Sequence, residues 1–127
     1  MSVQKIHPEG IPPVGGPYTP GMRVGNLLFC AGQVPNDEHG QLVGAGDIKV
    51  QVTQTLNNLE KVCQAAGTSM RHAVKVNAYL SSLNLFPAFN QAYAEFFGEA
   101  RPARTTVPVD LRGFDVEIDA VVVIPEG

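Results

Sequence analysis

The chain has 127 residues, of which 44% are hydrophobic and 17% are charged, and its net charge is -3. This length fits one domain spanning residues 1–127, and the composition excludes an intrinsically disordered chain. The acidic balance and the absence of a basic run argue against a nucleic-acid partner, and no segment is long and apolar enough to cross a membrane. The N-terminus also lacks the apolar core of a signal peptide, so we expect a cytoplasmic protein.

The sequence shows no spacing typical of a metal site. Its two cysteines, Cys30 and Cys63, do not form a C-x-x-C pair and lie among apolar residues. This context predicts buried, reduced thiols. The three histidines, His7, His39 and His72, are scattered through loop-like segments and are expected to be solvated.

The N-terminal third predicts irregular chain, a hairpin and a loop. Residues 1–21 are rich in proline and glycine, which favours irregular structure. Residues 22–34 hold two short apolar runs around Gly25-Asn26, which predict a hairpin with Leu27 to Val34 as its second strand. Residues 36–46 contain several turn formers and predict a loop.

The next segment has the period of an amphipathic helix. Asp47 is a suitable N-cap and Gly67 a suitable first residue after the helix. One apolar stripe recurs at spacings of three and four, and it consists of Ile48, Val52, Leu56, Leu59, Cys63 and Ala66. Residues 74–80 then alternate apolar and polar side chains, which predicts a strand.

A second helix is indicated by aromatic residues at helical spacing. These residues are Phe86, Phe89, Tyr93 and Phe96 or Phe97. We expect Asn84 to cap this helix and Gly98 to end it. We interpret the phenylalanines as helix packing and not as a platform for stacking nucleic-acid bases.

The C-terminal residues predict two strands and a hairpin. Residues 103–111 and 116–124 alternate apolar and polar side chains, and Arg112-Gly113 between them suits a short turn. The buried face of the first strand is expected to carry Ala103, Thr105, Val107, Val109 and Leu111. The opposite face of the hairpin is expected to display Arg104, Thr106, Glu117 and Asp119. This polar group is either the beginning of a site or only the solvated side of a sheet.

The predicted order of elements is β-β-α-β-α-β-β, an α/β domain with one sheet. Two helices cover one face of such a sheet, so the other face needs a different cover. That face carries Val121 and Val123 beside the polar group, and the whole chain is low in charge. Both features predict symmetric assembly through the uncovered face, with the polar group at or near a subunit interface.

Five segments resemble the RidA/YjgF family of reactive-intermediate deaminases. Arg101–Val107 and Val116–Ile118 resemble the C-terminal signature of that family. Gly16–Tyr18 and Ala31–Pro35 resemble its N-terminal segment and a strand end, and Phe89–Phe97 resembles its second helix. The segments follow the family's order and span nearly the whole chain, which makes the resemblance specific.

The resemblance implies a chorismate-mutase-like α/β subunit with two helices on one face of a single sheet, assembled as a homotrimer. It implies sites in the clefts between subunits, so the expected partners are a small-molecule carboxylate and other copies of the chain. The implied activity is hydrolysis of enamines or imines, such as 2-aminoacrylate or 2-iminobutanoate, to a 2-keto acid and ammonia. The implied chemistry uses no metal and no organic cofactor.

The resemblance also assigns site residues. Arg104 matches the arginine that holds the substrate carboxylate, and Glu117 matches the glutamate near the attacking water. Substrate-binding positions correspond to Tyr18, Ala31, Gly32, Asn90 and Thr106. Thr106 stands where many members have cysteine and Ala31 where many have serine, which leaves the substrate range open.

Several alternatives remain open on the sequence alone. In a simple hairpin Arg104 and Glu117 lie roughly 13 Å apart, a gap closed either by a long side chain plus substrate or by a neighbouring subunit. Without the family motif, Arg104 reads as a surface ion-pair residue, with Asp119 as its partner. A non-catalytic trimeric binder of small carboxylates, a stress-related chaperone and a pathway-specific imine deaminase are the alternative functions.

Overall fold

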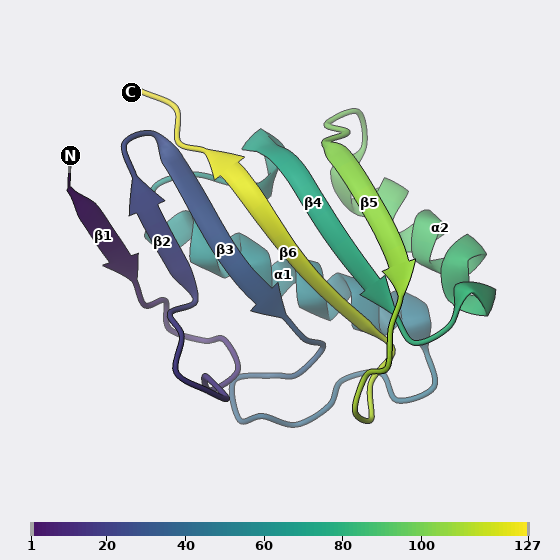
Figure 1. Ribbon diagram of the computed structural model, residues 1–127. Helices are drawn as coiled ribbons and strands as arrows, with labels where there is room; N and C mark the ends of the chain where they lie inside the picture. The colour runs from purple at the N-terminus through teal and green to yellow at the C-terminus, as the bar shows by residue number, and fades with distance from the viewer. Residues whose placement is uncertain (1, 127) are drawn as a thin grey trace.

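The computed structural model describes residues 2–126 and contains one sheet with both helices on one face, as expected (Figure 1). The strands are β1 (Val3–Ile6), β2 (Gly21–Val24), β3 (Leu27–Gln33), β4 (Ala73–Leu80), β5 (Ala103–Pro108) and β6 (Val116–Val123). Their order in the sheet is β1-β2-β3-β6-β4-β5. The helices α1 (Ile48–Ala65) and α2 (Phe86–Phe97) pack behind it.

The N-terminal hairpin is confirmed, and one strand was missed. Gly25 adopts a φ of 60° in the turn between β2 and β3, a value that suits glycine. Strand β1 lies inside the segment expected to be irregular. Its Ile6 is buried, and a Cβ on the neighbouring Gly21 would lie 3.2 Å from the Ile6 Cβ. Ile6 is thus an isolated apolar side chain that reaches the core, and its strand β1 adds one edge strand to the sheet.

Helix α1 begins and ends where the capping residues predict. The Asp47 carboxylate accepts a hydrogen bond from the Val50 N–H at 3.2 Å. The C-cap is Ala66, and Gly67 follows it with a φ of 84°. The predicted apolar stripe is buried against the sheet, and the two thiols, Cys30 and Cys63, are buried and free.

Helix α2 ends at the predicted glycine but starts without the predicted cap. The Gly98 N–H donates to the Ala94 carbonyl at 2.9 Å and closes the helix. Asn84 caps nothing: its own N–H donates to the Ser82 hydroxyl at 3.1 Å. That contact starts the short 3-10 helix Leu83–Leu85, which leads directly into α2 and takes the place of a capping side chain.

The predicted C-terminal hairpin is wrong, because β4 lies between β5 and β6. Strand β5 pairs in parallel with β4, and β6 pairs antiparallel with both β4 and β3. Helix α2 connects β4 to β5, and a helical crossover is what allows parallel neighbours. A central position in the sheet stabilises β6, because its alternate residues from Val116 to Val122 are all buried and apolar burial is favourable.

The prediction that the polar side chains of the two C-terminal strands share one face of the sheet is also wrong. Residues paired across neighbouring strands share a face of the sheet, and faces alternate along each strand. Arg104 pairs with the buried Val76 on the helix-covered face, and Thr106 likewise pairs with Ala78. Glu117 pairs with Tyr79 on the face that no helix covers, which we call the open face. On β5, the side chains of Ala103, Thr105 and Val107 are exposed and not buried.

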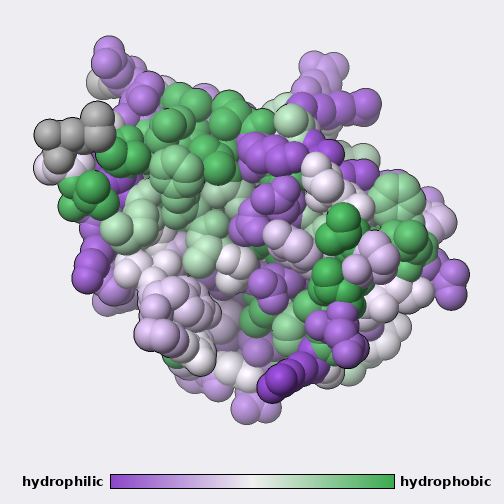
Figure 2. All heavy atoms as spheres, in the orientation of Figure 1, coloured by the Kyte–Doolittle hydropathy of each residue, from purple (hydrophilic) through white to green (hydrophobic). Residues whose placement is uncertain are grey.

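The open face combines an apolar patch with a polar group. Figure 2 views this face and shows apolar side chains gathered over β2, β3 and the end of β6, with hydrophilic ones crossing the middle. Strand register assigns to the apolar patch Met22, Val24, Leu27, Phe29, Val121 and Val123. Phe29 is 45% exposed. No helix within residues 2–126 is both long and apolar enough to span a membrane.

Candidate functional site

Arg104 lies on an aromatic platform formed by α2. Its guanidinium carbon is 4.7 Å from the ring centre of Tyr93, 5.1 Å from that of Phe89 and 5.6 Å from that of Phe86. Spacings of three and four residues place these rings on one face of α2. Within residues 2–126, no carboxylate lies within ion-pair distance of Arg104. The cation is therefore held by ring faces, and its hydrogen-bond donors remain available to an anion.

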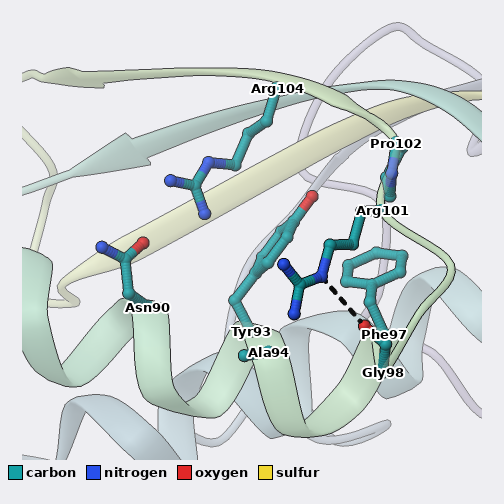
Figure 3. A pocket seen from close by; sticks show the side chains of 8 residues that line it. All are labelled: Asn90, Tyr93, Ala94, Phe97, Gly98, Arg101, Pro102 and Arg104. Atoms are coloured by element: carbon teal, nitrogen blue, oxygen red, sulfur yellow. Dashed lines mark hydrogen bonds between the residues drawn. The ribbon is translucent and has the colours of Figure 1, made fainter.

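A cavity of about 430 Å³ opens beside this guanidinium. Figure 3 shows its lining, which consists of Asn90, Tyr93, Ala94, Phe97, Gly98, Arg101, Pro102 and Arg104. The lining holds two arginines and no acidic residue. Its size falls within the range of small-molecule binding sites. A small anion is therefore the ligand class that this cavity suits.

Three buried polar atoms of β5 and α2 lack a partner among the described residues. They are the Asn90 Oδ1, the Tyr93 hydroxyl and the Thr106 Oγ1. Burying such an atom without a hydrogen bond costs about 1–3 kcal/mol, and two of the three residues, Asn90 and Tyr93, line the Arg104 cavity, which favours a bound ligand or water there. Burial raises the pKa of Tyr93 to about 12 despite the opposing effect of Arg104, which keeps this hydroxyl protonated.

A second group of site residues lies around a β-bulge on the other side of the sheet. Two residues of β3, Ala31 and Gly32, stand opposite the single residue Asp119 of β6. The Glu117 carboxylate packs directly on Gly32, where an added Cβ would lie 2.5 Å from Oε2. Burial, together with the nearby Asp119 charge, raises the pKa of Glu117.

Asp119 is held as a fixed neighbour of Glu117. It accepts hydrogen bonds from the Asn77 amide at 2.9 Å and from the Tyr79 hydroxyl at 3.1 Å. It therefore makes no ion pair with Arg104, contrary to the simple surface interpretation. Within residues 2–126, no side chain donates a hydrogen bond to Glu117. This leaves the raised-pKa carboxylate available to water or a ligand.

The Tyr18 loop adjoins the bulge. The Ala31 N–H donates to the Pro20 carbonyl at 3.0 Å, which ties the loop to β3. The Tyr18 ring is 50% exposed, and its hydroxyl accepts only a long hydrogen bond of 3.5 Å from the Gly15 N–H. Tyr18 is thus presented at the surface on the side of Ala31 and not fixed in the core.

The predicted site residues therefore form two groups within one chain. Asn90, Arg104 and Thr106 lie between the sheet and α2, whereas Ala31, Gly32 and Glu117 lie at the bulge. Arg104 and Glu117 point to opposite faces of the sheet, so one chain does not bring them together. No group of three or more His, Cys, Asp or Glu residues within 2–126 is arranged to hold a metal ion.

Two parts of the cavity, the aromatic residues of α2 and Arg101, were not predicted as site residues from the sequence. The phenylalanines of α2 were assigned to helix packing, Tyr93 was named only as a residue of that helix, and Arg101 was named only as part of the C-terminal signature. The signal that could have revealed the platform is the shared helix face of Phe86, Phe89 and Tyr93. This shared face indicates a site only if α2 is also known to cover the side of β5 that carries Arg104. The alternation of residues along β5 does not show which side α2 covers.

Comparison with known proteins identifies the family. Residues 10–124 match the family described as endoribonuclease L-PSP, and curated relatives carry the name RutC. The chain belongs to the RidA/YjgF/RutC family. This membership confirms the resemblance noted in the sequence.

Two relatives and one solved structure of the RidA/YjgF/RutC family illustrate the similarity. A RutC family protein of Pyrococcus horikoshii is 42% identical over 118 residues, 91% of this chain and 94% of its own length. The 3-aminoacrylate deaminase RutC of Acinetobacter baylyi is 36% identical, with 98% of this chain and 95% of that protein covered. The crystal structure of the YjgF gene product from E. coli has a TM-score of 0.87 at 32% identity, covering 94% of this chain and 98% of that one.

Proposed function

We propose that this protein hydrolyses small 2-imino or 2-enamino acids, such as 2-iminobutanoate or 2-aminoacrylate, to 2-keto acids and ammonia. The observation that carries the proposal is the Arg104 guanidinium, which lies without an acidic partner in a cavity whose lining includes Asn90 and Tyr93, each with an unpartnered polar atom. A relative named 3-aminoacrylate deaminase, 36% identical over nearly the full length, supports the same reaction class.

Arg104 binds the substrate carboxylate in this proposal. A guanidinium offers two parallel N–H donors that match the two oxygens of a carboxylate. The aromatic platform fixes the plane of that fork before the ligand arrives, since stacking on Tyr93 and Phe89 restricts its rotation. Asn90 lines the same cavity and Thr106 lies on the same face of β5 as Arg104, and each has a polar atom without a partner among the described residues.

In this proposal Glu117 accepts a proton from the attacking water and later donates it. The water oxygen bonds to the imine carbon while the water proton passes to the Glu117 carboxylate. The carboxyl group then returns the proton to the nitrogen, which gives a carbinolamine with one hydroxyl and one amino group. In the second half the Glu117 carboxylate takes the hydroxyl proton and passes it to the amino nitrogen, the carbon–nitrogen bond breaks, and ammonia leaves as the carbonyl forms. Burial and the Asp119 charge raise the pKa of Glu117, which makes its carboxylate a stronger proton acceptor than an ordinary glutamate. No electrons are transferred, so the step needs no redox cofactor.

The two halves of the site come from different copies of the chain. Arg104 with its cavity and Glu117 with the bulge lie on opposite faces of one sheet, so a second copy must supply one of them. The exposed apolar patch around Phe29 on the Glu117 side supports assembly through that face. We infer a homotrimer whose clefts join the Arg104 half of one subunit to the Glu117 half of its neighbour.

A non-catalytic binder of small carboxylates is the second candidate. The observation in its favour is that the Arg104 cavity is complete within one chain and needs no Glu117 to hold an anion. The binder and the enzyme share the carboxylate site and differ only in turnover. The same preparation therefore distinguishes them.

The test is release of ammonia and keto acid from imines generated in the assay. An amino-acid oxidase converts 2-aminobutyrate and other amino acids to imines, and the chain is added in catalytic amounts. We expect a protein-dependent acceleration over the spontaneous reaction in water. Binding of 2-ketobutyrate without acceleration supports the binder and contradicts the enzyme. Cleavage of mixed RNA in place of imine turnover contradicts both.

A further inference from the structure

A second cation, Arg101, lines the cavity that contains Arg104. Its Nε donates to the Gly98 carbonyl at 3.3 Å, at the C-terminal end of α2. Helix C-termini carry partial negative charge, so this contact holds Arg101 at the cavity wall. Within residues 2–126, Arg101 makes no ion pair and no other side-chain hydrogen bond. Its terminal nitrogens are therefore free to bind a ligand.

The charge of this cavity differs from that of the whole chain. The chain carries a net charge of -3, yet the cavity wall holds two guanidinium groups and no carboxylate. Such a concentration of one sign attracts anions and favours a ligand with more than one negative charge. A monocarboxylic imino acid uses the Arg104 fork alone and leaves Arg101 without a counter-charge.

The wall between the two arginines combines polar and apolar groups. In the view of Figure 3, the Tyr93 side chain rises between the two guanidinium groups. Its hydroxyl is buried and has no partner among the described residues. Phe97 and Pro102 line the same cavity and supply apolar contact for methylene groups.

We propose that the preferred substrates are short dicarboxylic 2-imino acids, such as the imines of aspartate and glutamate. Arg104 holds the carboxylate next to the imine carbon, and Arg101 holds the second carboxylate at the other end of the ligand. This assignment rests on the proposed function for the reaction. The recognition of the second carboxylate does not depend on turnover and is measurable by itself.

The test is calorimetric titration with two matched keto acids, 2-oxoglutarate and 2-oxopentanoate. They differ only in a terminal carboxylate against a methyl group. We expect the wild-type protein to bind 2-oxoglutarate about tenfold more tightly, the effect of one charge-assisted contact in a partly open site. Arg101→Gln should abolish this preference and leave the affinity for 2-oxopentanoate unchanged. Lys49→Gln, which removes the same charge from α1, should preserve the preference.

Turnover gives a second readout. The kcat/KM preference for the imine of glutamate over that of 2-aminopentanoate should fall in Arg101→Gln by the same factor as the binding preference. Equal binding of the two keto acids by the wild type, or an unchanged preference in Arg101→Gln, overturns the inference. Turnover of monocarboxylic imines without binding of 2-oxoglutarate overturns it while the proposed reaction stands. Binding of 2-oxoglutarate through Arg101 without any imine turnover supports it while the proposed reaction fails.

Discussion

Arg104 is a cation stabilised by aromatic faces and not by a counter-ion. Its guanidinium lies 4.7 Å from the Tyr93 ring centre, in a cavity that no acidic side chain enters. An acidic neighbour would occupy the donors that a substrate carboxylate needs. Stacking fixes the position of the guanidinium while it leaves the edge nitrogens free. In the proposed function, binding of the carboxylate therefore depends on the shape of this side chain as much as on its charge.

Arg104→Lys tests this dependence on shape. An ammonium keeps the charge but provides neither the two-pronged fork nor a flat surface for Tyr93 and Phe89. We expect kcat/KM for 2-iminobutanoate to fall roughly 10- to 100-fold, as expected for the loss of one strong charge-assisted contact. Arg112→Lys, at an exposed position, is the matched control. Near-normal turnover by Arg104→Lys would show that this residue does not bind the carboxylate as a fork.

Glu117→Gln separates water activation from carboxylate binding. Glutamine keeps the size of the side chain but accepts no proton, so we expect kcat to fall on the order of 10²-fold. Affinity for 2-ketobutyrate should change little, because Arg104 still holds the ligand. Steady-state kinetics and calorimetry on the same two proteins provide the measurement. An unchanged kcat excludes Glu117 as the proton acceptor.

The raised pKa of Glu117 adds a prediction on stability for this same variant. Burial and Asp119 raise the pKa of this carboxyl above its ordinary value of 4.5, so the folded chain holds the proton more tightly than the unfolded chain. The stability that this proton contributes is present below the ordinary value and is lost as the pH rises through the raised one. Glu117→Gln should therefore melt at a higher temperature than wild type near pH 7. The difference should shrink near pH 4.

At the scale of elements, the bulge in β3 positions Glu117. Gly32 has no Cβ, and this allows the carboxylate to lie directly on its backbone. Gly32→Ala would place a Cβ 2.5 Å from Oε2 and push the end of the glutamate side chain away. We expect roughly a tenfold loss of kcat with little change in melting temperature, because a flexible side chain moves and not the backbone. Gly15→Ala is the control, since no atom lies within 4 Å of the added carbon.

The elements predicted correctly were those whose signals are local. The caps Asp47 and Gly67 and the turn at Gly25 determine their own backbone, so the sequence specified them. The neighbours of β5 depend on a crossover through α2, and alternation within a strand carries no information on that pairing. Because this pairing was not predicted, Arg104 was assigned to the wrong face of the sheet. The inner side of β5 carries Arg104 and Thr106, a pattern typical of a solvated face. Only the position of α2 in the structure shows that a helix covers this side.

At the scale of the whole molecule, the apolar patch of the open face should be covered by another copy. We expect sedimentation equilibrium to give three times the 13.6 kDa mass of one chain at micromolar concentration. Phe29→Asp places an unpaired charge in the patch and should dissociate the assembly. Val50→Asp is a matched control because Val50 is similarly exposed, at 41%, but lies on the outer side of α1. A stable wild-type monomer contradicts assembly through this face.

Mixed assemblies test whether each site takes its two halves from neighbouring subunits. Arg104→Ala and Glu117→Gln should each be nearly inactive alone. When the two variants are coexpressed, a cleft between an intact Arg104 and an intact Glu117 arises wherever the right neighbours meet. Random mixing in equal amounts places such a pair at about one quarter of the clefts, so about one quarter of wild-type activity should return.

The control mixture combines Arg104→Ala with Arg104→Lys, which alter the same half of the site. No cleft in that mixture regains the guanidinium, so its activity should not exceed that of the Arg104→Lys protein. A site contained within one chain would restore nothing in either mixture. Recovery limited to the first mixture therefore requires that the opposite faces of the sheet, separated within each chain, meet across a subunit boundary.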